Sequence, residues 1–573
     1  MAGMLAPQPH VNEAELRRGL RNLMWDATFA TMVGALNSGV VLVALALWLG
    51  ATNAVIGLLA AIPLWTQILQ APAVSLVERL RARRQISIVA LVVARATLPI
   101  FAILPLIPDK RLALGILIVL EIVHTAFNAV CACSWNSWIR DLVPERRLGG
   151  FFARRTIFAT AIGMLCSLAA GFAMQSQKAA RGEGDGSVFM LLYGAGFVAG
   201  AISTWRLSMV PEPLMPEAAP RQTLWKLLKA PLKDPNFRTL IRFMASWQFA
   251  VNSATPFFTV YFVQQLGLGM GWVMTFTVVS QFANLVVLRM WGRLSDRFSN
   301  KSVLNLAAPA FLLAIAAMVF ASEFEDRLGL IVYLSVLHAF MGMASAGVNL
   351  ATGAAALKLA PRHAATSYLA ANSLIASAAA GMAPILGGIT ADFYAARELS
   401  FQILWRDPSG VSEFFGLHVS HWDFFFLISA IIGLYALHRL SFLQEEGTVR
   451  RRILVQEIVG ETRRGVRNLS PVRGLRPQFP AASLIERHGR LRVQERVERA
   501  RAGRDAPRAA AGGAQPPGGA ARREAEAPAA CLLDRLGRLG VPARGAGARA
   551  GRAARRAAAD GAQPTGGSAR AEA

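Results

Sequence analysis

The chain has few charged residues for its length. Asp, Glu, Lys and Arg together make up 17% of its 573 residues, whereas hydrophobic residues make up 54%. An ordinary soluble protein carries about 25% charged residues, so the composition excludes that class. Cysteine is also scarce: there are four, and Cys131, Cys133 and Cys166 lie inside apolar runs. We therefore expect no disulfide framework.

Several chemical motifs are missing as well. The sequence has no Gly-x-x-x-x-Gly-Lys phosphate loop, so we expect no chemistry driven by ATP. It has no His/Cys cluster with metal-ligand spacing and no evident nucleophile–base pair, so we expect no enzyme, no metal and no other cofactor. Residues 1–25 contain no short apolar core or cleavage site, which argues against a signal peptide. The net charge of +25 does not indicate nucleic acid, because the basic residues are not interleaved with aromatic ones.

The chain does contain many long apolar runs. Each has about 20 residues, enough to cross a hydrocarbon core of about 30 Å. Such runs must satisfy their own backbone hydrogen bonds, which favours helices, and they lack the alternating polarity of barrel strands. We expect an all-α membrane protein with twelve spans, at 27–50, 53–77, 86–107, 112–134, 157–177, 188–209, 238–265, 270–291, 303–322, 328–356, 367–393 and 422–443.

The pattern of the spans repeats once. The stretch 142–155 and the stretch 359–372 each follow one apolar run and precede another, and they are 217 positions apart. The same offset pairs Glu121 with His338, and nearly the same offset pairs Glu78-Arg79 with Asp296-Arg297. Repeated spans in one chain are typical of secondary transporters, whose substrate site lies between the two repeats near the middle of the membrane.

The basic residues predict the orientation of the chain. Arg and Lys gather in alternate loops, around 79–84, 140–155 and 289–301, and an excess of Lys and Arg marks the cytoplasmic side. We expect a cytoplasmic segment at 1–26, a first bundle at 27–209, a cytoplasmic linker at 210–237 and a second bundle at 238–443. Leu224 to Lys229 reads as a short interfacial helix in that linker. Both termini would then be cytoplasmic, in a monomeric protein of the bacterial inner membrane.

The tail at 444–573 differs in composition from the rest of the chain. Ile453 to Leu469 fits a basic amphipathic helix, and beyond Arg473 the chain is mostly Ala, Gly, Pro and Arg, without Lys. Such a segment cannot bury a core, so we predict disorder. Its Arg bias also fits a frameshift product, and binding of the charged tail to anionic lipid is the functional alternative.

One loop carries a resemblance to a known family. The residues Gly292-Arg293-Leu294-Ser295-Asp296-Arg297 are similar to the loop signature of the major facilitator superfamily, and the first-half copy departs from it at Val74 and Glu78. The resemblance implies two pseudo-symmetric six-helix bundles around a central cavity. It also implies a cytoplasmic gate, for which the candidates are Glu78, Arg79, Gly292, Asp296 and Arg297. A small residue at 292 favours close helix packing, and Asp296 near a helix N-terminus is favoured by the dipole. The alternative is a static loop that only sets topology.

Ionisable residues inside spans are costly and are functional candidates by default. Arg95 and Glu121 both fall near the middle of the bilayer on neighbouring antiparallel spans, so we expect them to pair. Glu121, His124 and Asn128 share one helical face, and His338 is the repeat partner of Glu121. This set predicts a pathway for substrate and protons, and a structural Arg95–Glu121 staple is the alternative. Asp26 falls at the predicted start of the first span and reads as a helix-start acid, with a proton carrier as the alternative.

Two further segments have an expected role. Gly381 to Gly388, with Pro384, reads as a close-packing and bending element of the eleventh span. The loop 395–421 carries aromatic residues that fit the bilayer interface, or a lid over the external mouth. The leading function is a proton-coupled secondary transporter whose partners are a small organic solute, protons and the lipid bilayer. An uncoupled facilitator and a transport-dead membrane sensor or scaffold are the alternatives.

Overall fold

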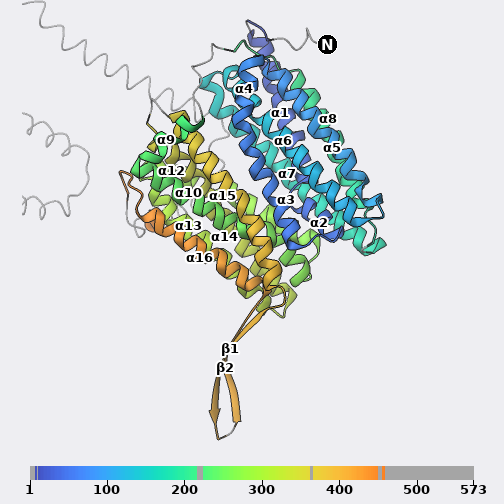
Figure 1. Ribbon diagram of the computed structural model, residues 1–573, viewed down its shortest axis with the longest axis vertical. Coiled ribbons are helices and arrows are strands. Elements are labelled where there is room, and N and C mark those ends of the chain that lie inside the picture. Colours follow the sequence, from blue (N-terminus) through green and yellow to red (C-terminus); the bar gives the residue numbers. More distant parts are fainter. Residues whose placement is uncertain are drawn as a thin grey trace, which may run out of the picture. The chain divides into compact units, whose positions relative to one another are not determined.

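The computed structural model describes residues 7–9, 11–182, 184–215, 224–361, 365–408, 410–448 and 454–457. The predictions for the tail beyond Arg473, and for most of 453–469, lie outside these ranges. The described residues are almost entirely helical, as the apolar runs predict. Figure 1 shows the first half of the chain in blue to cyan and the second half in green to orange.

The first half contains the elements up to Ser208. They are α1 (Glu13–Asn37), α2 (Val40–Trp48), α3 (Asn53–Thr66), η2 (Gln67–Leu69), α4 (Gln70–Leu80), α5 (Arg83–Ile103), η3 (Leu104–Leu106), α6 (Lys110–Leu142), α7 (Glu145–Arg181) and α8 (Ser187–Ser208).

The second half follows a linker helix, α9 (Leu224–Lys233), which agrees with the short helix expected there. Its elements are α10 (Pro235–Ala254), η4 (Thr255–Phe257), α11 (Phe258–Val260), η5 (Tyr261–Gln265), α12 (Met270–Arg297), α13 (Asn300–Ala317), η6 (Met318–Glu323), α14 (Arg327–Leu359), α15 (Ala365–Tyr394), β1 (Glu398–Asp407), β2 (Gly410–Ser420) and α16 (His421–Ser441).

The structure confirms the repeat in atomic terms. Helices α6 and α14 both have 33 residues, and they begin 217 positions apart, at Lys110 and Arg327. Each is capped by the aspartate that precedes it, because the carboxylates of Asp109 and Asp326 accept hydrogen bonds from the first free backbone amides. The chain therefore consists of two pseudo-symmetric bundles of membrane helices.

Eleven helical segments within the described ranges are long and apolar enough to span a membrane. The seventh predicted span corresponds to Pro235–Gln265, which is not among the eleven. This segment is interrupted by the 3-10 turn η4 and by the π-helical turn η5, and polar residues such as Gln248 and Asn252 lie along it. Its position in the repeat is consistent with a twelfth span.

The first helix starts earlier than predicted. Asn12 and Glu15 form a capping box, in which the Asn12 side chain accepts a bond from Glu15 N and the Glu15 carboxylate accepts one from Asn12 N. Helix α1 therefore runs from Glu13, and Asp26 lies in its interior with a buried side chain. The interpretation of Asp26 as a helix-start acid is wrong.

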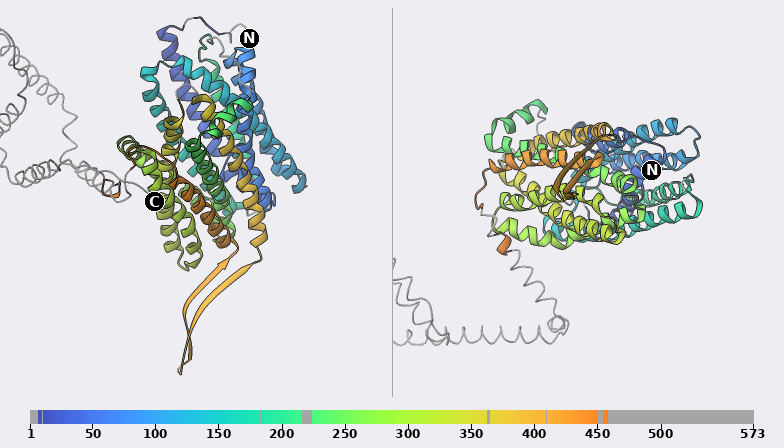
Figure 2. Two further views of the ribbon diagram at one scale, coloured as in Figure 1. Left: turned by 60° about the vertical axis from the view of Figure 1, so that its left-hand side comes forward. Right: turned by 90° about the horizontal axis from the view of Figure 1, so that it is seen from below.

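The segment 395–421, which we expected to be a loop, contains regular secondary structure. It forms an antiparallel hairpin of β1 and β2, with Glu398 opposite Ser420 and a bulge between Ile403 and Leu404. Figure 2 shows this hairpin extending away from the helices. Trp405 is 63% exposed, so this aromatic side chain projects outward from the hairpin.

The two bundles come into close contact at one end. We call the end of the bundles that carries the loops around 79–84 and 292–301 the basic end. The end that carries the starts of α3 and α12 is called the opposite end. Near the opposite end α3 packs against α15: a Cβ at Gly57 would strike the carbonyl of Pro384, and one at Gly381 would strike the ring of Trp65. This confirms the stretch 381–388 as a close-packing element.

Candidate functional site: a polar cavity and buried charges

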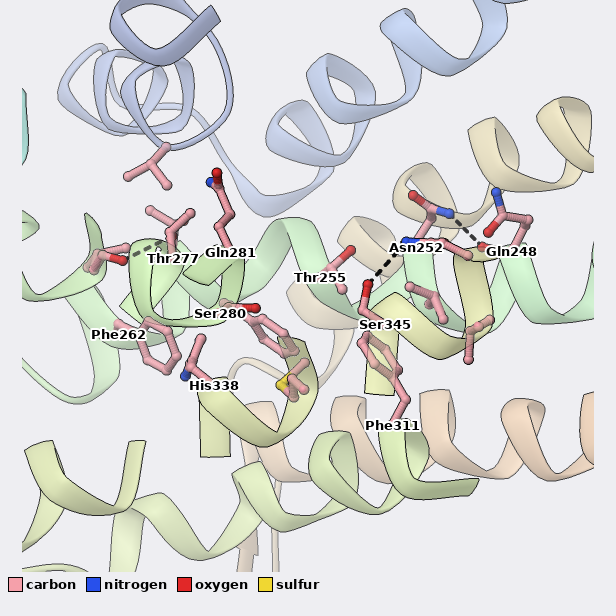
Figure 3. Close-up of a pocket in the computed structure, with 18 of the residues that line it drawn as sticks. Gln248, Asn252, Thr255, Phe262, Thr277, Ser280, Gln281, Phe311, His338 and Ser345 are labelled. Carbon is pink, nitrogen blue, oxygen red and sulfur yellow. Dashed lines mark hydrogen bonds between the residues drawn. The ribbon is translucent and has the colours of Figure 1, made fainter. Parts of the chain in front are cut away.

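A cavity of about 430 Å³ lies mainly within the second half of the chain. Figure 3 shows its walls, which come from α10 with η4, from α12 and from α14. Phe311 of α13 and Val40 of α2 also line it, so both halves of the chain contribute. The first and seventh spans therefore both contact this cavity, as the family resemblance implies.

The cavity is lined by amide and hydroxyl groups. The polar lining residues are Gln248, Asn252, Thr255, Thr259, Thr277, Ser280, Gln281, His338, Ser345 and Asn349. Some are bonded internally: Thr277 donates to Val273 O at 3.1 Å, and Asn349 Nδ2 donates to Ser345 Oγ at 3.2 Å. Within the described part of the chain, the side-chain amides of Gln248 and Gln281 have no hydrogen-bond partner. They are free to bind a solute.

One wall of the cavity is aromatic. The His338 ring is buried among Phe258, Phe262 and Phe276, with ring centroids 6.3, 5.4 and 5.2 Å away. His338 Nδ1 lies 2.8 Å from Leu334 O, so Nδ1 donates there and Nε2 is the acceptor of the neutral ring. Trp247 and Phe311 add a second aromatic pair to the lining.

In the part of the chain that the structure describes, no Asp, Glu, Lys or Arg is among the residues that line this cavity. A charged solute that lost its water there would meet no opposite charge, which is costly. The lining suits an uncharged solute with hydrogen-bonding groups and an apolar face.

The predicted residues Glu121, His124 and Asn128 lie elsewhere, on α6 in the first half. His124 reaches across to α5, because its Nδ1 lies 2.8 Å from Ala94 O, and Asn128 Nδ2 donates to His124 O at 2.8 Å. Of the predicted pathway residues, only His338 lines the cavity, and Arg95, Glu121, His124 and Asn128 do not.

The expected pair of Arg95 and Glu121 is not formed. Among the described residues, the Glu121 carboxylate has no ion-pair or hydrogen-bond partner although Glu121 is buried. Arg95 is also buried; its Nε has no hydrogen-bond partner among the described residues, and it interacts electrostatically with Asp26, Cys131 and His124. The stem of Arg95 lies against Gly200 of α8, where a Cβ would collide with it. Arg95 and Glu121 lie on helices that pack against each other, α5 and α6, but the two side chains face different neighbours.

Asp26 is the acid at the centre of the buried charges. Ser203 Oγ of α8 donates to Asp26 Oδ1 at 2.7 Å, and Arg155 Nη2 of α7 lies 3.9 Å from Asp26 Oδ2. The Arg155 guanidinium stacks over the ring of Trp135, 4.7 Å from its centroid. These contacts connect α1, α7 and α8. The capping box at Asn12 was the sequence signal that would have placed Asp26 inside a helix.

The proposed gate residues lie at the basic end. Gly292, Asp296 and Arg297 are on the last turns of α12, and only two residues separate them from α13. Asp296 is exposed and has no partner in the described ranges, whereas Arg297 Nη1 pairs with Glu457 at 2.6 Å. A Cβ at Gly292 would meet only a Leu350 methyl at 3.8 Å. In this structure Gly292 makes no close contact with another helix, and Asp296 lies in the last turn of α12, four positions before the start of α13. Glu78 and Arg79 lie on the last turn of α4.

Two glutamates that were not among the predicted site residues cap helices at the basic end. Glu212 accepts bonds from Arg83 N at 2.7 Å and Arg84 N at 3.1 Å, at the start of α5. Glu445 accepts bonds from Asn300 N at 3.3 Å and Lys301 N at 2.7 Å, at the start of α13. Each glutamate comes four residues after the last helix of its bundle, α8 or α16. The signal in the sequence was an acid within a few residues of the end of the last predicted span of each half.

Residues 27–384 match the Major Facilitator Superfamily, and the chain belongs to this family of membrane transporters. No curated protein sequence matches the chain. Among solved structures, a mutant of the nucleoside transporter NupG has a TM-score of 0.55 at 14% identity, with 75% of this chain and 100% of that chain covered. A D-xylose-proton symporter has a TM-score of 0.54 at 15% identity, with 76% and 99% covered. A bacterial homologue of the iron transporter ferroportin has a TM-score of 0.55 at 11% identity, with 75% and 98% covered. At these identities the likeness supports the fold alone.

Proposed function

We propose that the chain is a proton-coupled secondary transporter for a small, uncharged, polar organic solute, which binds in the 430 Å³ cavity. The observation that carries the solute class is the lining of the cavity, which combines unbonded amides with aromatic rings and lacks charged residues. Transport follows from membership of the family, and alternating access exposes such a site to each side of the membrane in turn.

Glu121 is the proposed carrier of the coupling proton. It is buried in a membrane helix and no described residue pairs with its carboxylate. An unpaired anion is costly in such a place, so Glu121 is expected to be neutral while it is enclosed and to ionise when it meets water. Asp26 differs, because Ser203 and Arg155 both compensate its charge. His124, one turn from Glu121, is the proposed relay.

The excess of basic residues at the basic end supports a cytoplasmic position for that end and for both termini. In a bacterium this corresponds to the inner membrane. Within this orientation, Glu78, Arg79, Gly292, Asp296 and Arg297 remain the proposed cytoplasmic gate. The exposure of Asp296 is what a gate residue would show when that side is open.

The solute class can be tested with the purified protein in proteoliposomes. Uptake of a pentose and of a nucleoside is compared with uptake of a sugar acid and of a nucleoside monophosphate. Gln281→Ala should weaken uptake of the uncharged solute about 3- to 10-fold in KM, the effect of one lost hydrogen bond. Asn284→Ala, one turn further along α12 and outside the lining, is the matched control. Uptake of only the sugar acid or the nucleoside monophosphate would contradict the proposal that the solute is uncharged.

The coupling residue is tested by Glu121→Gln, which keeps the shape and removes the titration. We expect accumulation driven by a pH gradient to be lost while solute exchange continues. If the variant still accumulates solute against its gradient, the proton is carried elsewhere and Asp26 becomes the candidate. If the wild-type protein equilibrates solute but never concentrates it, the facilitator alternative is correct.

A further inference from the structure

Two contacts at the opposite end join the bundles in the same way. The Asp392 carboxylate of α15 accepts hydrogen bonds from Asn53 N at 3.2 Å and Ala54 N at 2.9 Å, at the start of α3. Gln175 Oε1 of α7 accepts a hydrogen bond from Gly271 N at 3.1 Å, at the start of α12. In both cases a side chain of one bundle caps a helix of the other bundle.

These contacts are related by the internal repeat. Gln175 and Asp392 are 217 positions apart, and so are Ala54 and Gly271. The capping direction is reciprocal: the second half caps a helix of the first, and the first half caps a helix of the second. This symmetry shows that the contacts belong to the architecture of the repeat, since a chance contact would occur once.

The capped helices need an acceptor from outside. The first amides of any helix have no partner within it. At the start of α3, the Thr52 hydroxyl accepts a hydrogen bond from Val55 N at 3.4 Å. The amides of Asn53 and Ala54 donate to Asp392 instead. At α12 the preceding residue is Gly269, which has no side chain to act as a cap. Separation of the bundles would therefore leave these amides to water.

Glycines allow the capping helices, α15 and α7, to approach the helices that they cap, α3 and α12. A Cβ at Gly388, one turn before Asp392, would collide with the backbone of Asn53 and Ala54. A Cβ at Gly171, one turn before Gln175, would lie 2.7 Å from the Met274 side chain. Gly171 and Gly388 are again 217 positions apart. The pattern Gly-x-x-x-Gln on α7 and Gly-x-x-x-Asp on α15 thus forms a matched pair of docking surfaces.

We propose that Asp392 and Gln175 are paired positioning residues that hold the opposite end of the transporter closed, and that their hydrogen bonds to α3 and α12 must break before the cavity opens to that side. The proposal rests on alternating-access transport. In this proposal the two interbundle caps stabilise the closed state. They would have to break during transport, whatever the solute and the coupling ion.

The test measures the distance between the bundles at each end. Spin labels are placed on exposed positions, at Arg111→Cys and Leu328→Cys for the opposite end and at Arg140→Cys and Leu357→Cys for the basic end, in a cysteine-free background in nanodiscs. Asp392→Ala and Gln175→Ala should each move the population about tenfold (about 1.4 kcal/mol) towards longer distances at the opposite end and shorter ones at the basic end. The double variant should shift further.

Asp185→Ala is the matched control. Asp185 also caps a helix start at the opposite end, accepting a bond from Ser187 N at 2.8 Å, but within its own bundle. The hydrogen bonds from Ser187 and Gln177 hold the pKa of Asp185 at about 2, so it is ionised as a capping acid should be. The Asp185→Ala variant should leave both distance distributions unchanged.

Conservative variants separate a positioning role from a general loss of stability. Asp392→Asn and Gln175→Glu each retain an acceptor oxygen, and we expect them to restore part of the closed population. Unchanged distances in Asp392→Ala and Gln175→Ala would overturn the proposal, and so would an equal shift in Asp185→Ala. The distances need no substrate, so their outcome is independent of the uptake assay that tests the proposed function.

Discussion

The capping glutamates Glu212 and Glu445 allow a quantitative comparison. Each caps a helix start in its own half of the chain and forms an ion pair, but the two ion pairs differ in their exposure to solvent. The side chains of Glu212 and its partner Arg83 are both 0% exposed. Glu445 is 1% exposed, but its partner Lys358 is 53% exposed. Water therefore screens the second pair and not the first.

The structure sets the expected cost of each change. Glu212→Gln removes a buried charge and leaves Arg83 with Asp141 as its remaining acid; breaking a buried pair costs about 3–5 kcal/mol. Glu445→Gln weakens charge-assisted bonds to the start of α13, worth about 1.5–3 kcal/mol. The first variant should be the less stable of the two.

The assay combines thermal unfolding in detergent with hydrogen exchange of the peptides that begin α5 and α13. Glu212→Gln should lower the protection from exchange at the start of α5 and not at the start of α13. Glu445→Gln should lower it at the start of α13 and not at the start of α5. Glu446→Gln is the control, because Glu446 is exposed and adjacent to Glu445. If Glu212→Gln is no less stable than Glu446→Gln, the capping account is incorrect.

Three further outcomes follow from individual contacts. Ser203→Ala removes the hydroxyl that donates to the buried acid of α1, and should lower stability by about 1–2 kcal/mol in thermal unfolding. Ser208→Ala, which removes a half-buried hydroxyl that donates to Trp205 O within the same helix, should change stability little. His338→Phe keeps an aromatic ring among the phenylalanines and should cost less than about 1.5 kcal/mol, yet raise the KM for solute; an unchanged KM would exclude His338 from the site. Gly381→Ala should destabilise, because its Cβ strikes the Trp65 ring, whereas Gly353→Ala, with open space around it, should stabilise by about 0.5–1 kcal/mol.

The repeat and the fold were predictable because both depend on patterns that are visible in the sequence itself. Apolar runs of membrane length must be helical, and an offset of 217 positions already relates the helices that begin at Lys110 and Arg327. The hairpin formed by β1 and β2 was not predicted, because its aromatic residues also fit a loop at the bilayer interface. Strand pairing depends on register between two segments, which composition alone does not show.

The candidate site was predicted less well. Depth along a helix can be counted from sequence, but the direction a side chain faces depends on how helices are rotated against each other. The sequence predicts similar depths for Arg95 and Glu121, and the structure turns Arg95 towards Asp26 instead. Gln248, Asn252 and Gln281 were recognised as polar groups inside spans, but only packing shows that they share one cavity.

We propose that this protein uses a proton gradient to concentrate an uncharged solute. The most direct measurement is the ratio of internal to external solute in proteoliposomes at steady state, as a function of the imposed pH difference. One proton per solute predicts a ratio that rises about tenfold for each pH unit, since one unit is worth about 1.4 kcal/mol. A ratio that stays at one for every pH difference would contradict the claim.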